Sequence, residues 1–328
     1  MAAEQGNVLL HAEGIRMHFK GKNRRSGTVK AVDGITFDIM KGETFGVVGE
    51  SGCGKSTLGR LLIRLLDPTE GEIYLEGEDI SKLQGGALKQ MRKKAQIIFQ
   101  DPSACLNPRR TVKQILMEPF EIHGMKGSVD VNARIHELLT LVGLDDYHLS
   151  RYPHELSGGQ KQRIGIARAL ALEPRLIICD EAVSALDVSV QAQVLNLLQE
   201  LKEKLGLTYF FISHNLNVVY QVSDRVGVMY LGKMVEIARY DQLYEKRYHP
   251  YTEALLSAIP QVDQDIQTRR IHLEGEVPSP SDPPGGCRFH TRCPKCMGRC
   301  ESEEPELREI EPGHFVACHL YEKGDNAD

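Results

Sequence analysis

Long apolar runs are absent from this sequence, and so is a basic and apolar leader. No stretch approaches the ~20 apolar residues that a membrane-spanning helix needs. Residues Met1–Asn7 carry neither the basic nor the apolar region of a secretory signal. We therefore expect a cytoplasmic chain that does not itself form a pore.

An excess of one charge is also missing. Charged residues make up 26% of the 328 residues, and the formal net charge is −5. This charge balance gives no strong electrostatic attraction to nucleic acid or to an acidic membrane surface. The length suits two or three structural units of ~100–200 residues each, and no solenoid-type repeat is visible.

Cysteine is unevenly distributed along the chain. Three of the eight cysteines are scattered, whereas five crowd the carboxyl-terminal end: Cys287, Cys293, Cys296, Cys300 and Cys318. A stretch rich in proline and glycine, residues 278–286, precedes them and is typical of a linker. Clustered thiols in a cytosolic protein indicate a metal site before disulfides.

Strand-like apolar runs alternate with helix-like segments, which favours an α/β fold with a largely parallel sheet. Between Asp101 and Leu156 the pattern changes to helical periodicity, clearest at Val131–Val142, so we expect an inserted helical subdomain there. The expected strands of the sheet are Thr44–Val48, Gln96–Phe99, Leu176–Cys179, Thr208–Ile212 and Arg225–Tyr230.

A phosphate-binding motif, G-x-x-x-x-G-K-[ST], follows the first expected strand. Its glycines let backbone N–H groups converge on phosphates, Lys55 directs a positive charge toward the β- and γ-phosphates, and Ser56 offers a hydroxyl to Mg²⁺. A helix expected over Leu58–Leu66 adds its N-terminal dipole. The alternative is a glycine-rich turn with a chance lysine. The motif comprises Gly49, Glu50, Ser51, Gly52, Cys53, Gly54, Lys55, Ser56 and Thr57.

Two carboxylates end the apolar strand Leu176–Cys179. Asp180 suits a Mg²⁺–triphosphate site, where it would hold the ion through water. Glu181 would orient the attacking water and accept its proton late in the reaction. The alternative is an acidic pair that opens the following helix.

A second candidate anion site lies about a hundred residues after the P-loop. Ser157, Gly158, Gly159 and Gln160 follow Leu156 and precede a helix expected over Lys161–Ala171. A serine cap on that helix explains the same residues locally. This LSGGQ sequence is the signature of ATP-binding-cassette (ABC) proteins, which this chain resembles.

Further positions extend the resemblance over nearly the whole chain. Gln100 resembles the Q-loop glutamine, Asp187 ends a segment similar to the D-loop, and His214 resembles the switch histidine that contacts the γ-phosphate. The resemblance implies Mg²⁺ contacts from Ser56, Gln100 and Asp180, with ATP as the nucleotide. Phe19 resembles the aromatic residue that stacks on adenine; the alternative is an aromatic residue near a strand that packs in the core.

The subfamily resembled is that of the ATPase subunits of oligopeptide and dipeptide ABC importers. Two departures are visible, since Ala182 stands where many members carry proline, and Asn215 where aspartate often follows the histidine. Neither removes a catalytic group, so we expect activity to survive. The segments that carry the resemblance include Val29–Gly34, Val48–Thr57, Gln100–Pro102, Val183–Gln193 and His249–Thr252.

The implied fold is α/β, a P-loop ABC ATPase core with an antiparallel β subdomain, an inserted helical subdomain and a small cysteine-rich, metal-binding extension. We expect the first part of the core at 1–100, the helical subdomain at 101–160, the rest of the core at 161–258 and the extension at 259–328.

Four of the terminal cysteines match the pattern of peptide-importer ATPases. By resemblance, Cys287, Cys293, Cys300 and Cys318 would hold a [4Fe–4S] cluster. Cys296 departs from that pattern and forms a Cys-x-x-Cys pair with Cys293, which would also suit Zn²⁺. His290, His314 and His319 are alternative ligands, and unligated thiols are the remaining interpretation.

The resemblance implies an ATPase that energises peptide import from the cytoplasmic face of the cell membrane. Implied partners are two permease subunits, a second related ATPase forming a heterodimer, and an extracellular peptide-binding protein. An importer of nickel or another small solute, and a soluble ABC ATPase, are the alternatives. The latter would be expected to carry coiled-coil insertions or two cassettes, and neither is visible.

Overall fold

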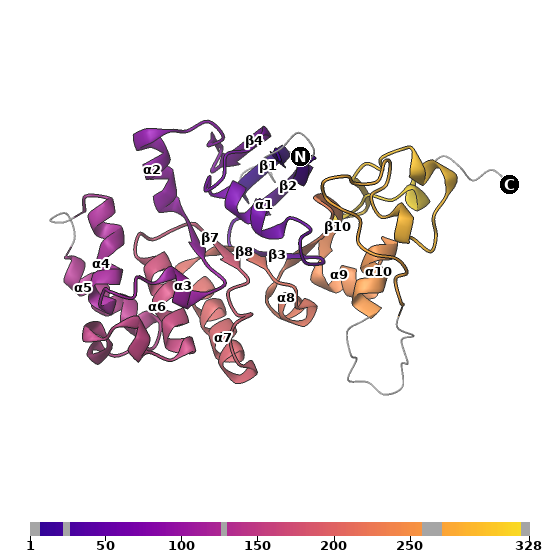
Figure 1. Ribbon diagram of the computed structural model, residues 1–328. Coiled ribbons are helices and arrows are strands. Elements are labelled where there is room, and N and C mark those ends of the chain that lie inside the picture. Colours follow the sequence, from indigo (N-terminus) through magenta and orange to yellow (C-terminus); the bar gives the residue numbers. More distant parts are fainter. Residues whose placement is uncertain (1–6, 22–26, 126–129, 258–270, 323–328) are drawn as a thin grey trace. The chain divides into compact units, whose positions relative to one another are not determined.

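The computed structural model describes residues 7–21, 27–125, 130–257 and 271–322 (Figure 1). The chain divides into two compact units, described separately below. The first unit is built mainly from residues 82–213, and the second from residues 10–39, 45–81 and 214–328.

The first unit contains three parallel strands, β6 (Ala95–Ile98), β7 (Leu176–Asp180) and β8 (Thr208–Ile212). Every residue of β7 and β8 is buried. Continuous apolar runs are typical of parallel strands that are covered on both faces. The predictions for these strands are confirmed to within one residue at each end.

Helices make up the rest of the first unit, as the helical periodicity between Asp101 and Leu156 indicated. Helix α6 (Gly158–Leu170) packs against α3 (Pro102–Cys105), α4 (Val112–Ile122) and α5 (Val131–Leu141), as Figure 1 shows. Thr111 starts α4 with a capping box, which satisfies backbone N–H groups that a helix start leaves unpaired. The other elements are α2 (Gly85–Lys94), α7 (Val188–Leu205) and the 3₁₀ turns η2 (Asp146–Ser150) and η3 (Pro153–Glu155).

The second unit begins with a four-stranded sheet in the order β2 (Val29–Met40), β1 (Val8–Phe19), β4 (Glu70–Leu75) and β5 (Glu78–Asp79). Strand β4 runs antiparallel to both β1 and β5. The alternation of buried and exposed residues along β1 and β2 is typical of an antiparallel sheet with one covered face.

A second group of strands carries the P-loop. Strand β3 (Thr44–Val48) is parallel to β9 (Arg225–Tyr230), which pairs antiparallel with β10 (Lys233–Arg239). Two strands of the carboxyl-terminal extension, β12 (His314–Val316) and β11 (Arg308–Glu311), continue this antiparallel run. The helices of the unit are α1 (Lys55–Leu62), α8 (Leu216–Val222), α9 (Tyr240–Glu245) and α10 (Pro250–Ser257).

Helix α1 differs from its predicted bounds at both ends. It begins at Lys55 inside the motif and ends at Leu62, four residues before the predicted end. Arg64 adopts a left-handed backbone conformation with φ of 54°, which does not continue an α-helix. Its buried guanidinium donates to the Ile80 carbonyl and pairs with Asp67 at 2.8 Å, which fixes this turn.

The predicted linker at 278–286 contains no helix or strand, and it is anchored to the sheet. The Lys30 N–H at the start of β2 donates to the Pro280 carbonyl at 3.0 Å. The extension that follows contains the 3₁₀ turns η4 (His290–Arg292), η5 (Gly298–Glu301) and η6 (His319–Tyr321).

A buried carboxylate ties β10 to two other segments. Glu236 is fully buried and accepts hydrogen bonds from the N–H groups of Tyr248 and His249, each at 3.0 Å. It also pairs with His314 on β12 at 2.7 Å. Multiple donors of this kind are what a buried carboxylate requires. Within the described ranges, no helix is long and apolar enough to cross a bilayer.

Candidate functional site

The predicted site residues divide between the two units. The second unit holds Phe19, the P-loop residues and His214, together with the terminal cysteines. The first unit holds Gln100, Ser157, Gly158, Gly159, Gln160, Asp180, Glu181 and Asp187.

Two glycines give the P-loop a path that other residues could not follow. Gly49 has a φ of 152°, and a Cβ atom there would lie 2.1 Å from the Met229 carbonyl oxygen. Gly54 has a φ of 105°, and its Cβ would lie 2.0 Å from the Ala31 carbonyl oxygen. The loop therefore runs tightly against β2 and β9, as a backbone cradle for phosphates requires.

Lys55, the first residue of α1, folds back over this loop. Its ammonium donates to the Gly49 carbonyl at 2.7 Å and to the Glu50 carbonyl at 3.0 Å, and only 5% of the residue is exposed. The first turn of α1 contains no acidic residue, so the positive end of the helix is not neutralised. Positive charge and helix dipole favour an anion at the same place.

Glu50 is held more firmly than its place in an exposed loop suggests. Its N–H donates to the Tyr251 hydroxyl at 2.9 Å. Its carboxylate pairs with Arg292, whose Nη1 lies 2.9 and 3.2 Å from the two oxygens. Sequence reasoning missed both partners, although Tyr251 lies in the segment His249–Thr252 that carried the resemblance.

In the first unit, the structure brings Glu181 and Gln100 together. The Gln100 side-chain amide donates to the Glu181 carboxylate at 2.8 Å. Glu181 has a φ of 49°, a left-handed conformation that its N–H bond to the Ile212 carbonyl at 3.0 Å helps to hold. Strained backbone of this kind concentrates at functional sites.

Asp180 ends strand β7 and is 3% exposed. Its backbone is paired in register with Ile212 on β8. The strand therefore delivers two adjacent carboxylates at its carboxyl end, the edge at which parallel α/β sheets bind ligands.

The signature residues form the start of α6. Ser157 and Gln160 make a reciprocal capping box, in which the Ser157 hydroxyl accepts from the Gln160 N–H and the Gln160 side chain accepts from the Ser157 N–H. The local prediction of a serine cap is confirmed. A Cβ on Gly159 would lie 2.6 Å from Val190 Cγ1, so the glycine permits the start of α7 to approach.

The remaining predicted positions are exposed. Asp187 precedes α7 at its N-cap position without a side-chain capping bond, and His214 lies two residues before α8. Asn215, one of the two departures, caps α8 by accepting from the Asn217 N–H at 3.0 Å, as aspartate would. Phe19 ends β1 and is 39% exposed, so its ring is accessible and is not part of the core.

Four of the terminal cysteines lie near one another. The pKa of the Cys318 thiol is raised to about 12, mainly by burial and with smaller contributions from nearby Cys287, Cys293 and Cys300. Burial likewise raises the pKa of Cys287 to about 11, with Cys300, Cys293 and Cys296 contributing. The Cys287 N–H donates to the Cys300 carbonyl at 2.8 Å, which closes the loop between them.

The alternative ligands have other environments. Cys296 is exposed. His290 contacts the Cys287 carbonyl, His314 pairs with Glu236, and His319 contacts the Glu303 carbonyl. Among the described residues, no group of three or more histidine, cysteine, aspartate or glutamate side chains has the geometry to hold a metal ion.

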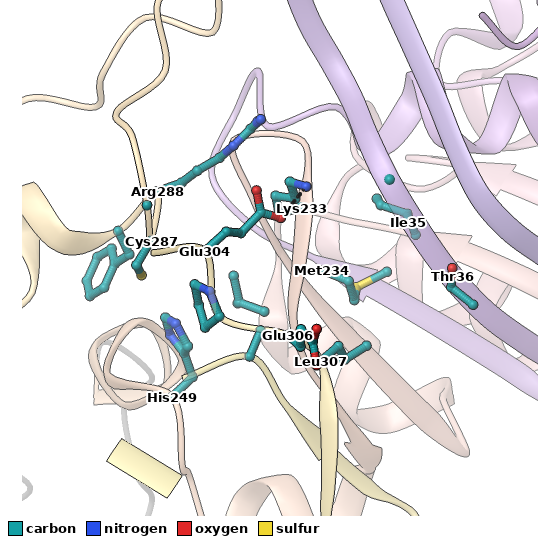
Figure 2. Close-up of a pocket in the computed structure, with 16 residues that line it drawn as sticks. Ile35, Thr36, Lys233, Met234, His249, Cys287, Arg288, Glu304, Glu306 and Leu307 are labelled. Atoms are coloured by element: carbon teal, nitrogen blue, oxygen red, sulfur yellow. Dashed lines mark hydrogen bonds and ion pairs between the residues drawn. The ribbon is translucent and has the colours of Figure 1, made fainter. Parts of the chain in front are cut away.

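A cavity of about 490 Å³ lies beside the extension (Figure 2). Ile35 and Thr36 from β2, Lys233 and Met234 from β10, and Cys287 and Arg288 from the extension line it. No P-loop residue does. Arg288 pairs with Asp33 and Lys233 pairs with Glu304, so the cations at this cavity are neutralised by protein carboxylates.

These features define a class of protein. A P-loop on β3 and α1, two carboxylates at the end of β7 and a capped signature helix are the parts of an ABC ATPase. The chain belongs to this family, since residues 32–184 match the family described as ABC transporter and a relative given below matches over its full length. Residues 235–300 match the family described as oligopeptide/dipeptide transporter, C-terminal region. Family membership makes ATP and Mg²⁺ the ligands of the nucleotide site.

Curated relatives match over nearly their full length. The oligopeptide transport ATP-binding protein AppF of Bacillus subtilis is 54% identical over 328 residues, which cover 98% of this chain and 100% of the relative. A putative peptide import ATP-binding protein of Brucella ovis is 51% identical over 310 residues, which cover 94% and 97%.

Solved structures share the fold. An ATP-binding cassette, solved as a dimer in a post-hydrolysis state bound to ADP and Pi, has a TM-score of 0.63 at 28% identity, covering 70% of this chain and 98% of that one. The protein cbiO1 of Clostridium perfringens, part of an ABC transporter complex, also has a TM-score of 0.63, at 27% identity, covering 74% and 92%.

Proposed function

We propose that this chain hydrolyses ATP to energise the import of peptides through a membrane ABC transporter. The observation that carries the proposal is the match of the whole chain to peptide-transport ATP-binding proteins, its carboxyl-terminal region included. The geometry supports it, because Gly49 and Gly54 allow the P-loop to lie close to neighbouring backbone and the Lys55 ammonium donates to the Gly49 and Glu50 carbonyls.

In the proposed nucleotide site, each residue has a defined role. Backbone N–H groups of residues 49–57 and the Lys55 ammonium bind the phosphates, and the Phe19 ring stacks on adenine. Ser56, Gln100 and Asp180 hold Mg²⁺, which neutralises charge on the phosphates. Glu181 orients the attacking water and accepts its proton, and Gln100 orients the Glu181 carboxylate through the 2.8 Å hydrogen bond.

In the proposed cycle, two cassettes enclose two ATP molecules. Ser157, Gly158, Gly159 and Gln160 of each subunit cover the γ-phosphate held by the P-loop of the other, and Asp187 lies along their interface. The exposed N–H groups at the start of α6 suit such an anion. Hydrolysis, assisted by His214, separates the cassettes. The solved relative that is a dimer with ADP and Pi supports this arrangement.

The proposed partners are inferred from the match to peptide-transport ATP-binding proteins. They are two permease subunits, a second related ATPase that completes a heterodimer, and an extracellular peptide-binding protein. The chain then lies at the cytoplasmic face of the membrane, held by the permeases. We assign the core to 1–100 and 161–258, the helical subdomain to 101–160 and the extension to 259–328.

For the extension, we propose that four cysteines ligate a [4Fe–4S] cluster: Cys287, Cys293, Cys300 and Cys318. A single Zn²⁺ with bonds of ~2.3 Å needs its sulfur atoms close to one another, whereas each cysteine of such a cluster binds its own iron atom and allows wider spacing. The cluster would supply folding free energy to a segment with few aliphatic residues.

Lys55→Ala tests the nucleotide site. Removal of the ammonium that lies over the P-loop is expected to abolish ATP binding, measured by titration calorimetry on the full chain. Lys89→Ala, at an exposed position on α2, is the matched control and should bind as the wild type does. Equal ATP affinity in Lys55→Ala and the wild type would contradict the proposed site.

Metal analysis tests the extension. Anaerobically purified protein is expected to contain iron and to absorb near ~400 nm, as iron–sulfur proteins do. Stoichiometric zinc without iron would contradict the cluster and favour the Cys293–Cys296 alternative.

A further inference from the structure

Glu50 connects the P-loop to the cysteine-rich extension. Three of its groups are engaged: the N–H by Tyr251 at 2.9 Å, the carbonyl by Lys55 at 3.0 Å and the carboxylate by Arg292. The Arg292 side chain is 8% exposed and the Glu50 side chain 27% exposed. An ion pair that is largely withdrawn from water is screened little by salt, so it constrains both partners.

Arg292 is itself fixed by the turn between two cysteines. The His290 N–H donates to the Cys287 carbonyl at 3.0 Å, and the Arg292 N–H to the Phe289 carbonyl at 3.0 Å. Cys293 follows directly, and its N–H donates to the His290 carbonyl at 3.2 Å. The position of the guanidinium therefore depends on the folded state of the turn that ends at Cys287 and Cys293.

The same turn reaches Glu50 by a second route. Phe289 is buried, and its ring lies 5.3 Å from the rings of both Tyr230 and Tyr251. Tyr251 is the residue whose hydroxyl accepts the Glu50 N–H. Aromatic packing at these distances holds rings in defined orientations, so the hydroxyl and the guanidinium approach Glu50 from one rigid assembly.

The negative charge of Glu50 is unfavourable for triphosphate binding at the P-loop. The second residue of the P-loop lies at a site built to bind a triphosphate, and a free carboxylate there repels the incoming phosphates. Arg292 neutralises this carboxylate and restrains its direction. With Arg292 paired to it, the Glu50 carboxylate no longer opposes anion binding at the P-loop.

We propose that Arg292 is a positioning residue that sets ATP affinity through Glu50 and thereby couples the fold of the Cys287–Cys293 turn to the nucleotide site. The inference rests on the proposed function, since it concerns the same P-loop. Coupling between two sites is reciprocal. ATP binding therefore stabilises the turn, and loss of the turn's fold weakens ATP binding.

A double-mutant cycle on the full-length chain tests the proposal. Arg292→Gln is expected to raise the dissociation constant for ATP about tenfold, and more at low ionic strength, because the Glu50 carboxylate is no longer neutralised. In that background, Glu50→Gln removes the repulsion and is expected to restore most of the affinity. Arg292→Lys keeps the charge and is expected to lie between the wild type and Arg292→Gln.

A matched control lies three residues along the same segment. Lys295→Gln removes an ion pair with Glu253 that does not involve the P-loop, and it should leave ATP affinity unchanged. A second readout is amide hydrogen exchange at residues 292–293. Saturating ATP should slow this exchange in the wild type and have less effect in Arg292→Gln.

Three results would overturn the proposal. They are unchanged ATP affinity in Arg292→Gln, loss of affinity that Glu50→Gln does not restore, and an equal loss in Lys295→Gln. Failure to restore would mean that Arg292 only supports the fold of the extension. Failure of the proposed function is recognised separately, because wild type and Lys55→Ala would then bind ATP equally.

Discussion

At the scale of single residues, Glu181 combines a left-handed backbone with a carboxylate that one side-chain amide orients. The Gln100 bond fixes the carboxylate, and the Ile212 carbonyl fixes the backbone. Both restraints reduce the conformational freedom of Glu181. This is consistent with a carboxylate whose orientation matters for ATP hydrolysis.

Glu181→Gln separates binding from hydrolysis. Glutamine has the size of glutamate and no basic carboxylate, so ATP binding is expected to persist while turnover falls at least about 100-fold. The variant should accumulate as a closed, ATP-bound dimer, seen by light scattering with Mg²⁺–ATP. Asp101→Asn, which changes an exposed carboxylate at the start of α3, is the control. Turnover at the wild-type rate in Glu181→Gln would refute the assignment of the base.

His249 predicts a pH dependence of stability. Burial lowers the pKa of its imidazole to about 4, partly offset by nearby Glu236. Between about pH 6.5 and pH 4 the unfolded chain therefore binds a proton that the folded chain does not, so stability falls as pH decreases through this window. The loss from this one group amounts to about 3 kcal/mol.

His249→Asn measures that contribution. Asparagine retains an acceptor for the Tyr251 N–H, which now donates to His249 Nδ1 at 3.1 Å, but it does not titrate. Denaturant unfolding at pH 7 and pH 4.5 should show a smaller loss of stability in the variant than in the wild type. Parallel losses in both proteins would contradict the role given to His249.

At the scale of elements, helix α6 shows how one motif serves two purposes. Its capping box uses Ser157 and Gln160 for local stability, while the N–H groups of its first turn remain at an exposed end. The structural and functional interpretations of the signature are therefore compatible.

Two substitutions at the cap distinguish these purposes. Ser157→Ala removes the acceptor and is expected to lower the free energy of unfolding by about 1 kcal/mol. Ser157→Asp retains a capping acceptor and should keep wild-type stability, yet its negative charge is expected to prevent transport-coupled ATP hydrolysis by repelling the γ-phosphate. Wild-type turnover in a stable Ser157→Asp protein would show that the signature does not face phosphate.

The sequence predicted elements well where hydrophobic patterning decides them. Residues 209–212 and 226–230 are apolar runs, and strands β8 and β9 each extend one residue before them. Helix α1 was misplaced at its end because the left-handed turn at Arg64 depends on its contact with the Ile80 carbonyl, 16 residues further along the chain, which no local pattern encodes. For the same reason the bond between Arg292 and Glu50, residues 242 positions apart, could not be predicted.

At the scale of the whole molecule, the motif set implies that a single chain is incomplete. The P-loop and the signature helix lie in different units of the chain, and the proposed mechanism joins them only between subunits. Substrate choice belongs to other subunits in this scheme, so the chain supplies energy and not selectivity.

The most direct measurement compares ATP turnover by the chain alone with turnover after reconstitution with its permeases, second ATPase and peptide-loaded binding protein. We expect weak turnover in isolation and a rise of at least about tenfold in the assembled, peptide-loaded system, because each ATP needs a signature helix from the partner subunit. Full turnover by the isolated chain, unchanged by these partners, would contradict the account.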